Sequence, residues 1–153
     1  MKRFISAPIT LAALALLSVL TNPAQARMEK IGDLESGVAV SSDASFLTQP
    51  GRELLRTWIL LDYKDEQRFD GSGSPLNPTP PTRYRSRKDY VQVDCRHNTY
   101  TELATQMFPD TEGKGAVVFE STYTRSPMPR FATPSSHEGV VLLFLCKGER
   151  PVN

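Results

Sequence analysis

Apolar and polar residues alternate most regularly over residues 82–95, in the stretch TRYRSRKDYVQVDC. Val91, Val93 and Cys95 share one parity there, and polar or amphipathic residues stand between them. A period of two is typical of a strand that is buried on one face. We therefore predict a strand over Thr82–Cys95 whose core face carries these three residues, with the cysteine at its inward end.

A second apolar segment, ELLRTWILLDYKD, spans Glu53–Asp65 and is apolar on both parities near its middle. This pattern fits a central strand that is covered on both faces, although leucine and arginine also favour a helix. The β-branched and aromatic residues of Thr57–Tyr63 favour the strand. We therefore predict a two-sided central strand at this place.

Shorter segments with strand-like patterns are separated by turn-forming residues. The three predicted strands are Ser36–Ser42, Tyr100–Phe108 and Ala116–Thr124. Asn98 precedes the second of them and tolerates the left-handed geometry of a turn. Glycine and proline recur through residues 71–81, which excludes regular structure and predicts a hairpin loop.

The C-terminal stretch SSHEGVVLLFLCKG is compatible with two structures. Ser135 followed by Glu138 forms a capping box, and Gly148 stands where a helix would end. The valines and the phenylalanine of the stretch favour a strand instead. As a helix, the stretch would carry one apolar stripe, made of Val141, Leu142, Leu145 and Cys146.

The N-terminus has the pattern of an export signal. Lys2 and Arg3 precede the apolar run Ile9–Leu20, and a small-x-small motif then ends at Ala26. A retained membrane anchor is the alternative, but 12 apolar residues fall short of the ~20 that a spanning helix needs. We predict cleavage between Ala26 and Arg27.

The domain organisation follows from this signal. Residues 1–26 are the signal, 27–50 an N-terminal segment that joins the domain, 51–148 the domain itself, and 149–153 a C-terminal tail. Lysine and arginine number 18 and aspartate and glutamate 17, and the signal holds two of the basic residues, so the exported chain has a formal charge of −1. Such a chain has no overall attraction for nucleic acid or anionic lipid.

Cys95 and Cys146 are the two cysteines of the sequence. In an oxidising compartment such a pair forms a disulfide, and two cysteines allow one intramolecular connectivity. A reactive or metal-binding thiol is the alternative, which the apolar surroundings of Cys146 disfavour. Neither cysteine ends the signal, as a lipid-anchored protein would require. We expect an exported protein, in the periplasm or at the cell surface, that is not a lipoprotein.

A basic row is the candidate binding site of the sequence, and it consists of Arg83, Arg85, Arg87 and Lys88. At strand spacing the three arginines project to one side, roughly 6.6–7 Å apart at each step. Guanidinium groups offer a planar fork of donors to carboxylates and sulfates. The alternative is a solvated strand edge that discourages aggregation.

No pattern of catalytic or metal-binding residues stands out. His97 and His137 lack a partner at metal-binding spacing, so we expect no metal and no cofactor. The motif GSGSP is not the G-x-S-x-G elbow of a serine hydrolase. Asp62 and Asp65 are interpreted as solvated carboxylates at a strand end. We therefore expect a protein that is not an enzyme.

The order of these segments resembles the surface-adhesin E family of exported Gram-negative bacterial domains. The resemblance covers residues 53–147, and more faintly 31–47. It is carried by TWILLDYKDEQ, YRSRKDYVQVDC, Tyr100, GKGAVVF and the closing SSHEGVVLLFLC, and above all by the positions of the two cysteines. Phe131 stands where relatives often carry a tryptophan.

The resemblance implies an α+β fold, in which an antiparallel sheet of about six strands carries a C-terminal α-helix and one disulfide. It favours the helix over the strand for residues 136–146. It also implies a binding module for proteins, because the founding adhesin binds vitronectin, laminin and plasminogen. The alternative is a periplasmic structural or accessory domain without a host ligand. The sheet edges of such a fold permit a homodimer.

Overall fold

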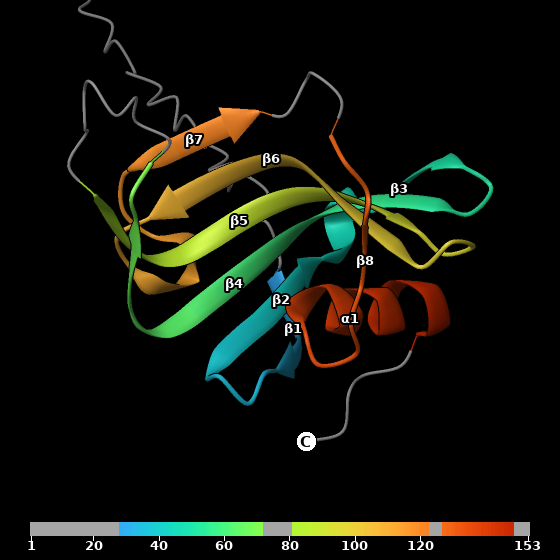
Figure 1. Cartoon of the computed structure of the whole chain (residues 1–153), viewed down its shortest axis with the longest axis horizontal. Coiled ribbons are helices and arrows are strands. Elements are labelled where there is room, and N and C mark those ends of the chain that lie inside the picture. The colour runs from blue at the N-terminus through green and yellow to red at the C-terminus, as the bar shows by residue number, and fades with distance from the viewer. Residues whose placement is uncertain (1–27, 72–80, 123–126, 149–153) are drawn as a thin grey trace, which may run out of the picture.

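The computed structural model describes residues 28–71, 81–122 and 127–148. The predicted signal with its cleavage position at Ala26 and Arg27, nearly all of the predicted loop 71–81 and the tail 149–153 lie outside these residues. One antiparallel sheet forms the body, and a C-terminal helix lies against it (Figure 1). Among the described residues, no helix is long and apolar enough to span a membrane.

Eight strands make up the sheet. Six of them follow one another in the order β1-β2-β4-β5-β6-β7, while β3 pairs with β4 and β8 pairs with β6. Their bounds are β1 Met28–Asp33, β2 Val38–Asp43, β3 Thr48–Gly51, β4 Leu54–Phe69, β5 Thr82–Asp94, β6 Thr99–Phe108, β7 Phe119–Thr122 and β8 Arg130–Phe131. The short 3₁₀ turns are η1 (Ala44–Phe46) and η2 (Thr111–Gly113), and the C-terminal helix is α1 (His137–Leu142) with a π-helical extension η3 (Leu143–Lys147). The predicted α+β class is thus confirmed.

The long pair β4 and β5 forms the centre of the sheet. Ile59, Leu60 and Leu61 are consecutive and all are buried, which confirms a central strand covered on both faces. β4 extends beyond the predicted end at Asp65, because its polar continuation pairs with the start of β5 after a register shift. Backbone pairing sustains this part of the strand where the hydrophobic pattern has ended.

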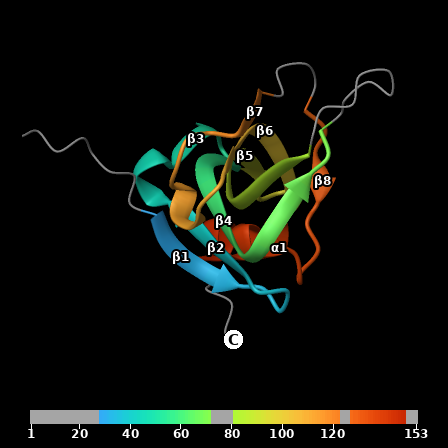
Figure 2. The ribbon, with the colours of Figure 1, turned by 90° about the vertical axis from the view of Figure 1, so that its left-hand side faces the viewer.

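The hydrophobic core lies between the sheet and α1. Val91 and Val93 are fully buried on the predicted core face of β5, and Val141 and Leu142 of α1 belong to the same cluster. The strands twist and curve when viewed from the side, and α1 is seen behind β2 and β4 (Figure 2). Since α1 also contacts β1 and β2, the helix covers one face of the strongly curved sheet.

The helix predicted for the C-terminal stretch is confirmed, but its capping box is wrong by one residue. Ser136 is the N-cap, and its hydroxyl accepts a hydrogen bond from the backbone N–H of Gly139 at 3.3 Å. Glu138 therefore occupies the second helical position rather than the third. Gly148 ends the helix in the left-handed conformation, with φ = 69°, as predicted.

Several strand predictions were incomplete. β7 begins at Phe119 rather than Ala116, because Gly115 has φ = 87° and prolongs the turn, while Val117 and Val118 remain exposed. β1, β3 and β8 were not predicted. They show little periodicity because they are short or at the sheet edge, and β1 buries a single side chain. Their pairing partners, rather than their own sequences, make them strands.

The predicted disulfide is confirmed between Cys95 and Cys146, whose Cα atoms are 5.5 Å apart. Cys95 directly follows β5, and Cys146 lies in η3. Both cysteines pack against the core cluster. The bond therefore fixes the C-terminal end of the helix to the end of a central strand.

Gly139 of α1 lies in close contact with the segment that precedes the helix. A Cβ atom there would overlap the carbonyl oxygen of Thr133 and lie 2.9 Å from Cα of Pro134. We expect Gly139→Ala to lower the free energy of unfolding by about 1–3 kcal/mol, as overpacking does. The control is Gly148→Ala, which meets no atom within 4 Å and should cost only ~1 kcal/mol for its left-handed backbone. Urea unfolding of the oxidised proteins measures both, and a smaller loss at Gly139 than at Gly148 would contradict the prediction.

Candidate functional site

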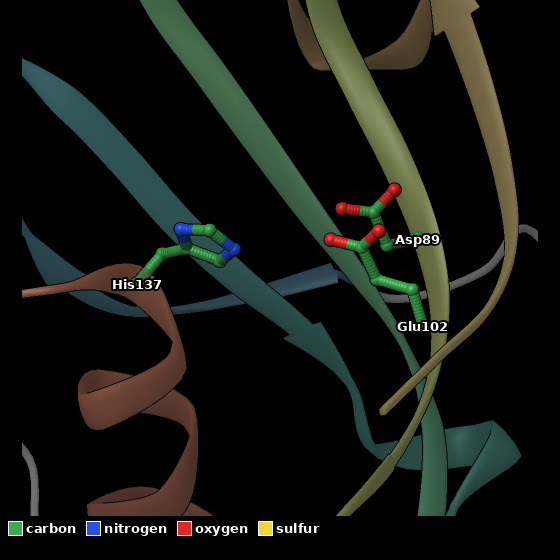
Figure 3. A group of neighbouring side chains, drawn as sticks. All are labelled: Asp89, Glu102 and His137. Carbon is green, nitrogen blue, oxygen red and sulfur yellow. The ribbon is translucent and has the colours of Figure 1, made fainter. Parts of the chain in front are cut away.

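Charged side chains gather where the first turn of α1 meets the sheet. Figure 3 shows three of them, with the carboxylates of Asp89 and Glu102 on the sheet and the ring of His137 on the helix. We call the whole group the ion-pair cluster, and its members are Arg87 and Asp89 of β5, Glu102 of β6, Arg130 of β8, and His137 and Glu138 of α1. It joins the neighbouring strands β5 and β6 to β8 and α1, which follow later in the chain.

The central pair of the cluster is Arg87 and Asp89. The two residues are two positions apart on one strand, so their side chains lie on the same face. Nε of Arg87 donates a hydrogen bond to Oδ2 of Asp89 at 2.8 Å, and Nη2 of Arg87 lies 2.7 Å from the same oxygen. The hydroxyl of Thr105, the cross-strand neighbour of Asp89, donates to Oδ1 at 2.5 Å. Both carboxylate oxygens are therefore engaged.

Burial and the neighbouring charges act in opposite directions on the pKa of each member of this pair. Burial raises the pKa of the fully enclosed Asp89 carboxyl, and the neighbouring Arg87 guanidinium opposes that change. Burial also acts to lower the pKa of Arg87, but the charge of Asp89 and the nearby Tyr63 and Glu102 raise it above its ordinary value. The guanidinium accordingly stays charged and holds Asp89 in place.

A β-bulge brings Glu102 to the cluster. The register between β5 and β6 shifts after Tyr90, which pairs with Ala104, so that Val91 pairs with Glu102. Without the extra residue Leu103, Glu102 would stand opposite Gln92 on the other face of the sheet. Bulges commonly re-aim side chains in this way. The bulge therefore decides that a charged residue of β6 faces the helix.

Arg130 connects the sheet to the helix. Its Nη2 lies 2.6 Å from Oε1 of Glu102 and 3.8 Å from Oε1 of Glu138, and Arg87 approaches the same Glu102 oxygen at 3.4 Å. Burial raises the pKa of Glu138, but the Ser136 hydroxyl and other neighbours outweigh that effect, so the pKa lies below its ordinary value. The first turn of α1 is thus attached through ionised groups.

His137 occupies the edge of the cluster. Its Nδ1 lies 3.3 Å from Oε2 of Glu138, and its ring meets that of Tyr100 edge to face, with centroids 5.8 Å apart. Nε2 of His137 and the hydroxyl of Tyr100 are buried and have no hydrogen-bond partner among the described residues. Burial lowers the pKa of His137. A neutral ring therefore suits this place.

The shape of the cluster resembles a metal site, but its chemistry does not. Asp89, Glu102 and His137 each offer one ligand atom, and these atoms lie within 4.8 Å of one another. Two guanidinium groups already neutralise the carboxylates, however, and a divalent cation would have to displace them. We therefore assign no metal to this group.

Sequence reasoning missed the cluster, although one signal was present. Arg87 and Asp89 share the parity of Val91 and Val93, so two charged residues were due to face the core. Buried charges are rare unless they are paired. The pattern alone could not name their partners on the other elements.

The structure divides the predicted basic row. Arg83 and Arg85 are exposed. Arg83 forms an ion pair with Glu66, and Arg85 donates a hydrogen bond to the backbone oxygen of Lys64. Arg87 belongs to the ion-pair cluster, where its guanidinium pairs with Asp89 and Glu102. Lys88 points to the opposite face, where its Nζ lies 5.3 Å from the centroid of the Phe108 ring. The four residues therefore do not form one surface.

The face of the sheet opposite to α1 carries a groove of about 780 Å³. The turn η2 overhangs it, held by hydrogen bonds from the backbone N–H groups of Glu112 and Gly113 to the side chains of Asp62 and Ser86. Burial raises the pKa of Asp62. The groove has a mixed lining, made of Met28, Lys30, Ala39, Ser41, Leu60, Asp62, Lys88, Glu112, Gly113 and Lys114.

Comparison with known proteins agrees with this architecture. Crystal form II of Haemophilus influenzae protein E superimposes with a TM-score of 0.52 at 15% identity, covering 84% of this chain and 95% of that chain. Protein E from non-typeable Haemophilus influenzae gives 0.51 at 15% identity, covering 84% and 82%. No curated protein sequence matches significantly. The family model described as surface-adhesin protein E matches residues 29–147, which include both cysteines and every member of the ion-pair cluster. The chain therefore belongs to the surface-adhesin protein E family.

Proposed function

We propose that this protein is an exported, non-enzymatic module of the bacterial envelope that binds other proteins. The family match over residues 29–147 carries the proposal. The disulfide supports it, because such bonds persist outside the reducing cytosol. The ion-pair cluster supports it as well, since its carboxylates are engaged by guanidinium groups and not poised for acid–base chemistry. In this proposal residues 1–26 direct export and are removed before Arg27.

The ligand in this proposal is a host matrix or plasma protein, of the kind that the founding adhesin of the family binds. Arg83 and Arg85 are the proposed contacts, because both are exposed and near the start of β5. Their forked donors suit carboxylates on a protein surface. Their partners described above, Glu66 and the backbone of Lys64, lie outside the ion-pair cluster, so both arginines can be changed without removing a member of it.

Replacing Arg83 and Arg85 by serine should weaken binding to immobilised vitronectin or laminin about tenfold, corresponding to ~1.4 kcal/mol. The loss should shrink at high salt, because exposed charges are screened. A matched control is Arg52→Ser with Arg96→Ser, which removes the same charge from two exposed positions elsewhere. Surface plasmon resonance measures all three proteins. Equal affinities for wild type and both variants would remove the two arginines from the proposal.

A periplasmic accessory domain is the second candidate function. It is favoured by the use of both cysteines in the disulfide, which leaves none for lipid attachment at the signal. Protease treatment of intact cells separates the two candidates. Digestion of the protein in intact cells supports surface display, whereas full protection until the outer membrane is opened supports the periplasmic role.

A further inference from the structure

The helix is held to the sheet by different forces at its two ends. The disulfide fixes the C-terminal end through Cys146. At the other end, Arg130 bridges Glu102 of the sheet and Glu138 of the helix. A covalent bond does not respond to pH, whereas an ion-paired contact can. The N-terminal end is therefore the part of the helix that can be released separately.

His137 is placed where a proton would disturb this contact. Its Nδ1 faces Glu138, so the neutral ring is best accommodated with the hydrogen on Nδ1. A second proton would go to Nε2, which is buried and has no hydrogen-bond acceptor among the described residues. A charged donor that is enclosed without an acceptor is unfavourable.

The charged groups around the ring are already paired with one another, so they cannot easily rearrange to stabilise a protonated His137. The groups that face His137 are Arg87 and Asp89 of β5, Tyr100 and Glu102 of β6, Arg130 of β8 and Glu138 of α1 itself. The nearby carboxylates of Asp89 and Glu102 are held by Arg87 and Arg130. A protonated ring must either break these ion pairs or leave its place beside Tyr100.

We propose that His137 is an acid-sensitive latch, which secures β8 and the first turn of α1 to the sheet as a neutral ring and loosens both when it takes up a proton. The disulfide retains the far end of the helix, so the released segment swings away without separating from the domain. This device concerns the fold itself and does not depend on the proposed binding function.

The sign of the pH dependence follows from the direction of the pKa change. Burial lowers the pKa of His137 below its ordinary value of about 6.5. We call the protein closed when β8 and the first turn of α1 are attached to the sheet, and open when they are released. As the pH falls, the open form therefore takes up the proton at a higher pH than the closed form. The neutral ring stabilises the closed form fully above about pH 6.5. This stabilisation is lost as the pH falls through the lower pKa that His137 has in the closed form.

The test follows the imidazole ring and the backbone of the exported, oxidised protein. His97→Gln leaves His137 as the remaining histidine, since the sequence contains two. We expect NMR to show that the ring titrates below free histidine. Between pH 7.5 and 5.5, amide protection corrected for intrinsic exchange should fall several-fold at residues 131–140, which are the end of β8, the connection and the first turn of α1. The largest possible loss of protection is about tenfold for each unit by which the pKa of His137 is lower in the closed form than in the open form. Amides of β4 and β5 should keep their protection.

Two variants at the same position provide the controls. His137→Gln cannot titrate, and His137→Phe also preserves a ring beside Tyr100. Both should remove the acid-induced loss of protection at residues 131–140. The proposal is overturned if the ring titrates at or above free histidine, or if both variants respond to acid as strongly as the parent. The ring titration needs no substitution at position 137, so it tests the proposal even if a variant at that position misfolds.

Discussion

Arg87→Met is expected to lower the free energy of unfolding of the oxidised protein by about 3–5 kcal/mol, the loss typical of breaking a buried ion pair. Methionine fills much of the same space but provides no charge. The Asp89 carboxylate would remain fully buried beside Thr105 with its cation removed. Urea unfolding followed by tryptophan fluorescence measures the loss, since the chain has one tryptophan, Trp58, in β4.

A double variant and a surface control identify the cause of that loss. Adding Asp89→Asn to Arg87→Met removes the unpaired charge, so the double variant should be more stable than Arg87→Met alone. Arg83→Met breaks the exposed pair with Glu66 and should cost less than ~1 kcal/mol. If Arg87→Met costs no more than Arg83→Met, the buried pair does not stabilise the fold in the way described.

Removal of the disulfide is expected to have an effect of similar size. Cys95→Ser with Cys146→Ser should lower the free energy of unfolding by about 4 kcal/mol, the value of the chain-entropy model for a loop of this length. The cysteines are 51 residues apart in sequence, so the unfolded chain gains much freedom without the bond. The helix should suffer most, because α1 has six residues and is too short to persist alone.

Chemical reduction provides the control for the serine variant. Reduced wild type and the double serine variant should unfold at the same urea concentration, well below oxidised wild type. Thiol titration of unfolded, unreduced protein should find no free sulfhydryl. A serine variant as stable as oxidised wild type would contradict the predicted role of the bond.

Local pattern determined the parts of the fold in which one feature decides the outcome. The alternation through Val91 and Val93 identified the core face of β5, since a strand has one period and one buried side. The run around Ile59–Leu61 identified a strand covered on both faces. The strand limits at Ala116 and Asp65 were less accurate, because turn geometry and backbone pairing decided them.

The C-terminal helix marks the boundary of what local pattern could decide. Its residues favour strand and helix about equally, and the family resemblance resolved the choice. Ser135 and Ser136 are both adequate caps by sequence. In the folded chain Ser136 takes the role, with its hydroxyl accepting from the N–H of Gly139, and Gly139 packs closely against Thr133.

By itself, the sequence determined the disulfide, the central strands and the core-facing residues, because each depends on a short pattern or on a single possible pairing. The export signal, which also depends on a short pattern, stays a prediction. Only the tertiary structure decided the ion-pair cluster and the division of the basic row. The bulge at Leu103 turns Glu102 toward the helix, and β8 brings Arg130 beside it. Arg87 pairs with the buried Asp89, whereas Arg83 stays exposed. Charged residues have no periodic signature of their own, so their role depends on which distant elements the fold brings beside them.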